Sequence, residues 1–147
     1  MDINQKYMLD PRDIRNVVSS DGNRIGVELK LLIPYYRGVA LSMIDDLYVK
    51  MDGCEFQKEQ LTFSVDGFTY RWPEIETVTD FRWEFGDKAT VFVSLPGGLM
   101  VTPKCTVEVG CAIRMSYSGR QVRPTVVYAT VDPCAMESVR YDKPVMV

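Results

Sequence analysis

Residues 33–47 read Ile-Pro-Tyr-Tyr-Arg-Gly-Val-Ala-Leu-Ser-Met-Ile-Asp-Asp-Leu and separate two runs of strand-forming residues. Before this stretch, residues 26–33 read Gly-Val-Glu-Leu-Lys-Leu-Leu-Ile; after it, residues 47–51 read Leu-Tyr-Val-Lys-Met and end at an Asp-Gly pair. Alternating polarity bounded by turn residues predicts a strand on each side. Pro34 lacks a backbone N–H and Gly38 frees the backbone, so we expect a sharp turn between the strands.

We call residues 34–38 the corner. Its three large side chains, Tyr35, Tyr36 and Arg37, are expected at the end of a sheet, where side chains project from the fold. Tyr and Arg are enriched where proteins bury surface against partners. One interpretation therefore makes the corner the working surface of the molecule. The alternative is a structural corner whose tyrosines cap the core.

Turn residues divide the rest of the chain into short segments. Asp-Gly pairs at 21–22 and 66–67 predict hairpins, and Pro73 suits the start of a helix of one or two turns. Strands are predicted at 14–18, 24–33, 47–51, 62–65, 68–70, 89–95, 105–117 and 125–131. The longest of these has apolar residues at its odd positions, which is typical of an antiparallel sheet with one buried face. The sequence predicts an all-β, antiparallel β-sandwich, immunoglobulin-like or similar, with little helix.

The chain length of 147 residues is that of a single domain with a sizeable core. We expect the sandwich core at about 12–131 and a C-terminal extension at 132–147. The last four residues, Pro-Val-Met-Val, are apolar, so the extension is expected to dock on the domain or on a partner. The N-terminus has no signal-peptide pattern and no apolar run reaches membrane length, which predicts a cytoplasmic protein without a membrane span.

The charge balance argues against two classes of partner. Seventeen basic and twenty acidic residues give a net charge of −3, and no run of Lys or Arg occurs. Nucleic acid and anionic membrane surfaces both select basic patches, so neither is an expected partner.

The sequence contains no histidine. Ser-His and Cys-His nucleophiles, imidazole acid–base catalysis and His-ligated metals are therefore excluded for this chain. The cysteines, Cys54, Cys105, Cys111 and Cys134, form no C-x-x-C pair, and we expect buried thiols that act as small hydrophobes.

Asp45 and Asp46 are the most visible carboxylate pair, but neighbours on a strand point to opposite faces, so a solvated or turn-stabilising role is favoured. A metal-dependent enzyme built on carboxylates alone stays open, although no constellation favours it. No catalytic, cofactor-binding or metal-binding residue is predicted here.

The aromatic residues suggest a second kind of site. Trp72, Trp83, Phe85, Tyr35 and Tyr36 could form a platform on which sugar rings stack. This would make the chain an independent carbohydrate-binding β-sandwich module. For Trp83 and Phe85 the favoured alternative is core packing, because large aromatics dominate core burial.

Three blocks in order resemble the small β subunit of bacterial C-glycoside deglycosidases. They are the corner with its continuation to Gly53, the Arg-Trp-Glu-Phe-Gly run at 82–86, and residues 89–99, which end in Pro-Gly-Gly-Leu. The resemblance covers roughly residues 12–117.

That family implies a two-subunit lyase. Its α subunit is similar to sugar-phosphate isomerases, a TIM barrel that holds a divalent metal, usually manganese, and the acid–base residues. Its substrate is a 3-keto C-glycoside, cleaved by β-elimination. The resemblance implies that this chain is the non-catalytic partner and holds no cofactor. We expect contacts with the α subunit, near its catalytic face, from Tyr35, Tyr36, Arg37, Trp83 and Phe85. These residues are also expected to form a wall on the aglycone side of the pocket.

Overall fold

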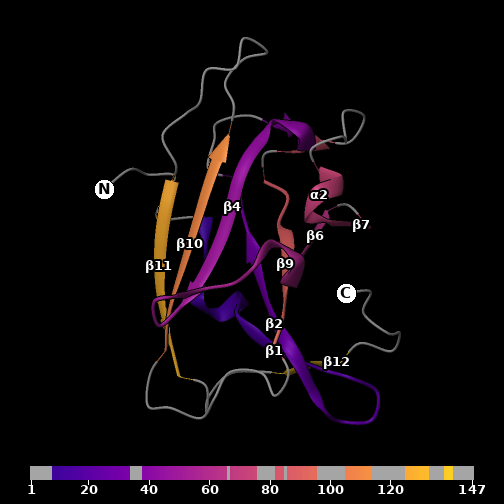
Figure 1. Ribbon diagram of the computed structural model, residues 1–147, viewed down its shortest axis with the longest axis vertical. Coiled ribbons are helices and arrows are strands. Elements are labelled where there is room, and N and C mark those ends of the chain that lie inside the picture. Colours follow the sequence, from indigo (N-terminus) through magenta and orange to yellow (C-terminus); the bar gives the residue numbers. More distant parts are fainter. Residues whose placement is uncertain are drawn as a thin grey trace.

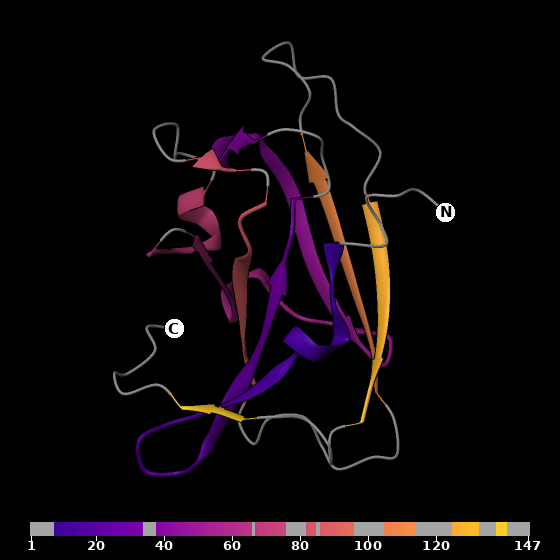
Figure 2. The ribbon, with the colours of Figure 1, turned by 180° about the vertical axis from the view of Figure 1, so that it is seen from behind.

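The computed structural model describes residues 8–33, 38–65, 67–75, 82–84, 86–95, 105–113, 125–132 and 138–140. Two main sheets face each other as the layers of a β-sandwich (Figures 1 and 2). Short helical turns connect the strands: η1 (Pro11–Asp13), η2 (Leu41–Met43), η3 (Lys58–Gln60) and α2 (Trp72–Ile75).

The first sheet has six strands in the order β12 (Ser138–Arg140), β1 (Arg15–Val18), β2 (Arg24–Leu31), β9 (Ala89–Ser94), β6 (Leu61–Val65) and β7 (Phe68–Arg71). The second sheet has four, in the order β11 (Thr125–Val131), β10 (Cys105–Ile113), β4 (Ile44–Met51) and β5 (Cys54–Glu55). A separate ribbon pairs β3 (Val39–Ala40) with β8 (Arg82–Trp83).

The predicted antiparallel β-sandwich is confirmed. All the strand pairs in the described residues are antiparallel except one, in which β12 runs parallel to β1. That exception lies within the predicted C-terminal extension, so residues 138–140 of the extension add an edge strand to the sandwich.

Alternating apolar residues of the two sheets meet in the core. Sheet one contributes Val27, Leu29, Leu31, Phe63, Val91 and Val93; sheet two contributes Leu47, Val49, Val107, Val109, Cys111 and Val127. Because side chains alternate across a strand, each of these strands turns one set of residues toward the opposite sheet. The predicted inward face of β10 is confirmed at its five odd positions from 105 to 113.

The predicted hairpins agree with the structure. β1 and β2 are joined by the turn at 19–23, where the Gly22 N–H donates to the Ser19 carbonyl oxygen at 2.9 Å. β6 and β7 pair around Gly67, which has a φ of +84°. Such a φ favours glycine, because it has no Cβ to clash. The predicted short helix at Pro73 is the single turn α2.

One cysteine prediction is wrong. Cys105 and Cys111 are buried as expected, but Cys54 is exposed, because it lies on the two-residue edge strand β5 beside a turn. Cys134 lies outside the described residues.

An N-terminal segment extends the pairing of β2 beyond the short strand β1. Leu9 forms an isolated antiparallel bridge with Leu31, and the Leu32 N–H donates to the Met8 carbonyl oxygen at 2.9 Å. This pairing places η1 beside the C-terminal end of β2. No helix in the described part of the chain is long and apolar enough to cross a membrane.

Candidate subunit interface

Residues 34–37 of the corner lie outside the described residues, whereas Gly38 and the residues on either side are described. Tyr35, Tyr36 and Arg37 lie outside the described residues, as does Phe85. The chain enters the corner from Ile33, which is buried, and leaves it at Gly38, which leads into β3. The geometry of the site therefore comes from the residues on either side.

The ribbon of β3 and β8 brings the two predicted contact segments together. Val39 is paired with Trp83, and Ala40 with Arg82, although about forty residues separate the strands along the chain. In Figure 2 this ribbon lies near one end of the molecule's long axis, with the short salmon arrow of β8 at the upper left. The exit of the corner and the Trp83 segment are thus neighbours in space, an arrangement that sequence spacing alone could not reveal.

Gly38 is required by the close approach of these segments. A Cβ at this position would collide with the Glu84 carboxylate and would lie 3.0 Å from the Trp83 carbonyl oxygen. A contact this short with a backbone atom cannot be relieved by a rotamer change alone. The glycine in the corner therefore fixes how close the chain can pass to the Trp83 turn.

Trp83 lies inside the sandwich, with no exposed surface. Its indole and the Phe63 ring form a T-shaped contact, with centroids 5.5 Å apart and an interplanar angle of 72°. The indole N–H donates to the Asp87 carbonyl oxygen at 2.9 Å. The core interpretation of this residue is confirmed, since a buried indole needs both apolar neighbours and a partner for its N–H. A contact with another subunit at this turn would be made by residues around Trp83 instead of by its ring.

The same hydrogen bond shapes the turn that follows β8. The Asp87 N–H donates to the Glu84 carbonyl oxygen at 3.1 Å, and Gly86 has a φ of +92°. Trp83 thus holds the turn from inside while the Glu84 side chain remains exposed. The indole acts as an anchor that orients a surface loop.

The predicted sugar-stacking platform is wrong for both tryptophans. Trp72 is 7% exposed and Trp83 is 0% exposed, whereas stacking needs an open ring face. The Lys58 ammonium lies 4.9 Å from the centroid of the Trp72 ring, a cation–π distance. Trp72 packs at the start of α2 and supports the fold there.

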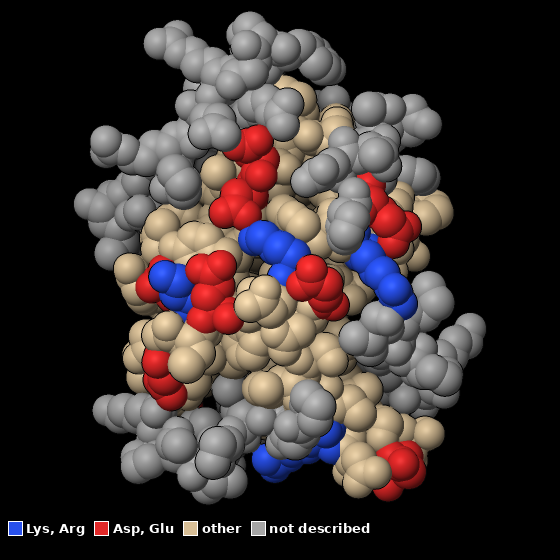
Figure 3. Space-filling view, viewed as in Figure 1, with Lys and Arg blue, Asp and Glu red and all other residues tan. Residues whose placement is uncertain are grey.

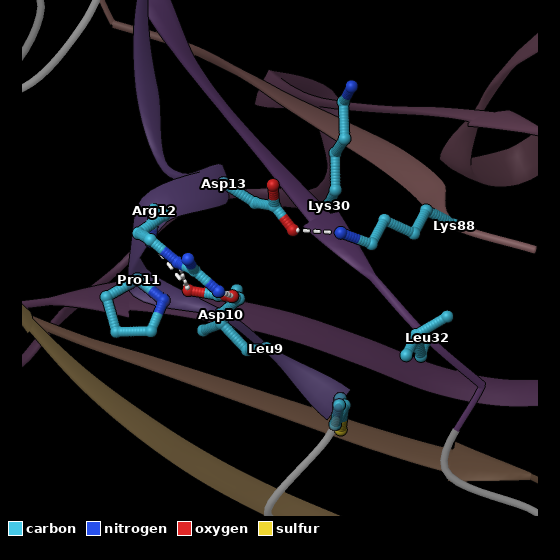
Figure 4. A pocket seen from close by; sticks show the side chains of 9 residues that line it. Leu9, Asp10, Pro11, Arg12, Asp13, Lys30, Leu32 and Lys88 are labelled. Carbon is cyan, nitrogen blue, oxygen red and sulfur yellow. Dashed lines mark hydrogen bonds and ion pairs between the residues drawn. The ribbon is translucent and has the colours of Figure 1, made fainter.

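A hollow of about 360 Å³ lies between the N-terminal segment and the first sheet (Figure 4). Its apolar lining comes from Met8, Leu9, Pro11 and Leu32, and its charged lining from Asp10, Arg12, Asp13, Lys30 and Lys88. Leu32 directly precedes the segment that leads to the corner, and Lys88 follows the Trp83 turn. Two residues that line the hollow are therefore close in sequence to the two predicted contact segments.

Two ion pairs lie in the lining of this hollow. The Lys88 ammonium lies 2.7 Å from an Asp13 carboxylate oxygen and ties η1 to the residue before β9. Arg12 and Asp10 form the second pair, also at 2.7 Å. Hydrogen bonds from the Arg12 side chain and backbone lower the pKa of Asp10 to about 2. The Lys88–Asp13 pair thus holds the N-terminal segment on the sheet, whereas the Arg12–Asp10 pair is internal to that segment.

Asp46 and the thiols of Cys105 and Cys111 are engaged in the fold. Asp46 pairs with Lys58 at 2.7 Å, which agrees with a structural role for that residue. Burial raises the pKa of Cys105 to about 11 and that of Cys111 to about 12, so both stay protonated thiols at neutral pH. Within the described ranges, no group of three or more Cys, Asp or Glu side chains is placed to hold a metal ion.

Charges of both signs alternate over the surface. On the face shown in Figure 3, Lys and Arg side chains are interspersed with Asp and Glu side chains across the middle of the molecule. Fold and surface together define a β-sandwich of the kind that serves as a binding module or a subunit.

The chain belongs to the C-glycoside deglycosidase beta subunit family, whose model matches residues 4–117. It is 32% identical over 95 residues to a C-glycoside deglycosidase beta subunit of Eubacterium cellulosolvens, a match that covers 65% of each chain. A protein of the same name from Arthrobacter globiformis is 28% identical over 92 residues, which cover 63% of this chain and 70% of that protein. A 3'-dehydrocarminate deglycosidase beta subunit from a Microbacterium species is 30% identical over 92 residues, which cover 63% and 68%. The match thus spans just under two thirds of the Eubacterium relative.

Proposed function

We propose that this chain is the non-catalytic β subunit of a two-subunit, metal-dependent lyase that cleaves 3-keto C-glycosides. The observation that carries the proposal is the family match over residues 4–117, which includes the corner, the β3–β8 ribbon and both main sheets except their edge strands β11 and β12. The Microbacterium relative is named for a 3'-dehydro substrate, in keeping with a ketone at that position of the sugar.

The proposed reaction explains why the work is divided between two chains. The ketone acidifies the proton on the neighbouring carbon C2, and a base removes that proton. The resulting enolate breaks the bond between C1 and the aryl carbon, and the released aryl carbon takes up a proton. The base must lie within hydrogen-bond reach of the C2 proton. A divalent metal, manganese in this proposal, would supply Lewis-acid polarisation of the ketone oxygen. Following the family resemblance, we assign the metal and the base to an isomerase-like TIM-barrel α subunit, a division that is consistent with the absence of histidine from this chain.

The part proposed for this chain is to dock on the α subunit and shape its pocket. We place the contact at the corner and the Trp83 turn, with Tyr35, Tyr36 and Arg37 as contacting side chains and Phe85 beside them. Three contacts fix the described residues that border this proposed contact: the Val39–Trp83 pairing, the close approach at Gly38, and the indole N–H bond to Asp87. A preorganised surface loses less conformational entropy on binding than a loose loop. A 3-keto C-glycoside would lie at or near this contact.

Co-purification tests the docking part of this proposal. The chain is co-expressed with an isomerase-like α subunit that carries an affinity tag, and the amount retained is compared for the wild type, Arg37→Ala and Arg12→Ala. Arg12 is a useful control because its guanidinium is exposed and its ion-pair partner, Asp10, is only two residues away in the sequence. We expect Arg37→Ala alone to reduce retention. Full retention and full turnover by Arg37→Ala would show that the corner is not the contact.

A further inference from the structure

Strand β11 forms one outer edge of the four-stranded sheet. All seven of its residues pair with β10 in an unbroken register, from Cys105–Val131 to Cys111–Thr125. Among the described strands, none pairs with its other side, which faces outward at one border of the sandwich (Figures 1 and 2). An edge strand presents unpaired N–H and C=O groups that invite another strand, and proteins usually protect such edges with charges, prolines, bulges or short length.

The other described edge strands carry such protection, whereas β11 does not. β5 has two residues and includes Glu55, β12 has three and includes Arg140, and β7 has four and includes Arg71. β11 reads Thr-Val-Val-Tyr-Ala-Thr-Val and contains no charge, no proline and no glycine. It is also the longest of the four edges, and its pairing with β10 shows no bulge.

From Val127 to Val131 the side chains of β11 alternate between the core and the surface, while Thr125 and Val126 are both half-buried. Val127, Ala129 and Val131 are buried in the sandwich. On the outer face, Tyr128 is 66% exposed, the larger exposure of the two exposed large apolar residues described. Its neighbour Thr130 is exposed too. An uncharged edge with an exposed aromatic at its middle is the composition expected of a strand that pairs with another chain.

We propose that β11 pairs antiparallel with β11 of a second copy of this chain, about a two-fold axis at Tyr128. The strand is self-complementary in this register: Thr125 faces Val131 of the partner subunit, Val126 faces Thr130 of the partner subunit, and Tyr128 faces its own equivalent. No charge faces a like charge, the arrangement that destabilises cross-strand pairs. The two tyrosines form a cross-strand aromatic pair on the outer face, and the two four-stranded sheets become one sheet.

The choice of a second copy of this chain as the partner of β11 is supported by the position of β11 relative to the family match. The matched residues end at 117, so Thr125–Val131 lies outside the part of the chain shared with the family. A docking surface common to β subunits is expected within residues 4–117, which leaves β11 for another role. The proposal therefore does not depend on the proposed function and uses neither the corner nor the Trp83 turn.

Disulfide trapping tests the register of the pair. Residues facing each other in an antiparallel pair have Cα atoms about 4.5–5.5 Å apart, within the roughly 4.4–6.8 Å that a disulfide spans. In full-length chain with Cys54 and Cys134 replaced by serine, Tyr128→Cys is expected to give a covalent dimer on mild oxidation. Thr125→Cys is the matched control on the same strand, because its two copies would be roughly 20 Å apart at about 3.3 Å per residue. Efficient dimers from Thr125→Cys, or none from Tyr128→Cys, would overturn the proposed register.

Sedimentation without crosslinking tests the association itself. We expect the wild type to show a concentration-dependent dimer and Thr130→Lys to weaken the association at least tenfold, because it sets a charge on the edge. Thr69→Lys places the same charge on the exposed strand β7 of the other sheet and should leave the dimer unchanged. A wild type that stays monomeric at all concentrations, or equal weakening by both variants, would overturn the proposal. A third result would also overturn it: the wild type is monomeric, and Thr130→Lys reduces its binding to an α subunit. The edge would then bind that subunit and not a second copy of this chain.

Discussion

The ring of Tyr48 lies against Gly110 on the outer face of the four-stranded sheet, where the two residues are direct cross-strand partners. A Cβ on residue 110 would overlap the ring itself. The ring is held in place because the Tyr48 hydroxyl donates to a Glu108 carboxylate oxygen at 2.6 Å and the Lys50 ammonium lies 5.3 Å from its centroid. The absence of a side chain at Gly110 therefore determines how a polar cluster spans β4 and β10.

Gly110→Ala is predicted to lower the free energy of unfolding by about 1–3 kcal/mol, the usual cost of overpacking. The new methyl group must displace the Tyr48 ring and disturb its bond to Glu108. Urea unfolding measures the effect, and a double-mutant cycle isolates its cause. In a Tyr48→Ala background the clash is absent, so Gly110→Ala should cost much less there. An equal cost in both backgrounds would show that the ring contact is not the reason.

Trp83→Phe is predicted to destabilise the protein by about 1–3 kcal/mol, because the Asp87 carbonyl loses its donor and part of the ring volume is lost. Urea unfolding would measure this change, and the retention on a tagged α subunit would fall as the turn at 84–87 loosens. Trp72→Phe is the matched control, since it trims the other buried tryptophan away from this turn. Loss of retention with Trp72→Phe but not with Trp83→Phe would contradict the role assigned to the indole anchor.

Stability is predicted to decline in alkali through the buried thiol of Cys111. Burial raises its pKa from the ordinary thiol value of 9.0 to about 12, so the folded state holds the proton more tightly than the unfolded chain. The resulting stabilisation is complete below pH 9 and is lost as the pH rises from 9 toward 12. Burial and the bond to Glu108 also raise the pKa of Tyr48, which acts in the same direction. Urea unfolding at pH 8 and pH 10.5 should show a smaller drop for Cys111→Ala than for the wild type; an identical drop would rule out this thiol as a cause.

Thiol labelling should separate the described cysteines by exposure. Cys54 is exposed and is predicted to react with a maleimide or disulfide reagent in the native protein, whereas Cys105 and Cys111 should react only on unfolding. Mass spectrometry of labelled peptides measures each site. Rapid native labelling of Cys111 would contradict the burial described for the core.

The ion pair between Lys88 and Asp13 is predicted to contribute up to about 1 kcal/mol, reduced by screening because the lysine is half exposed. Lys88→Met should lower stability in low salt and should have less effect in 1 M NaCl. Arg12→Met, which breaks an exposed pair within η1, should have little effect in either condition. A larger effect of Arg12→Met would contradict the view that the Lys88 pair secures the N-terminal segment.

The strands and hairpins could be predicted from the sequence because their signals are local. Alternation along residues 105–113 and the Asp-Gly pair at 21–22 each depend on neighbouring residues, and both predictions agree with the structure. The pairing of Val39 with Trp83 could not be predicted in this way, because it joins two segments that are far apart in the sequence and have no common pattern of apolar residues. The parallel pairing of β12 with β1 is another contact of this kind, as it depends on a crossover from the C-terminal region.

Burial of the two tryptophans also depends on tertiary packing. Alternation places Trp83 on one side of a strand but does not decide whether that side faces the core or a partner. Its T-shaped contact with Phe63, a residue twenty positions earlier, decides in favour of the core. Cys54 was predicted to be buried from residue type alone, and the two-residue edge strand β5 overrides that preference.

Under the proposed function, this chain is one half of a C–C bond-cleaving enzyme. The most direct measurement is turnover of a 3-keto C-glucoside in the presence of manganese, with the purified chain alone, an isomerase-like α subunit alone, and the two co-expressed. We expect release of the aglycone only when both chains are present, with the chain retained on the α subunit during purification. Full turnover by the α subunit alone, or turnover by this chain alone, would contradict it.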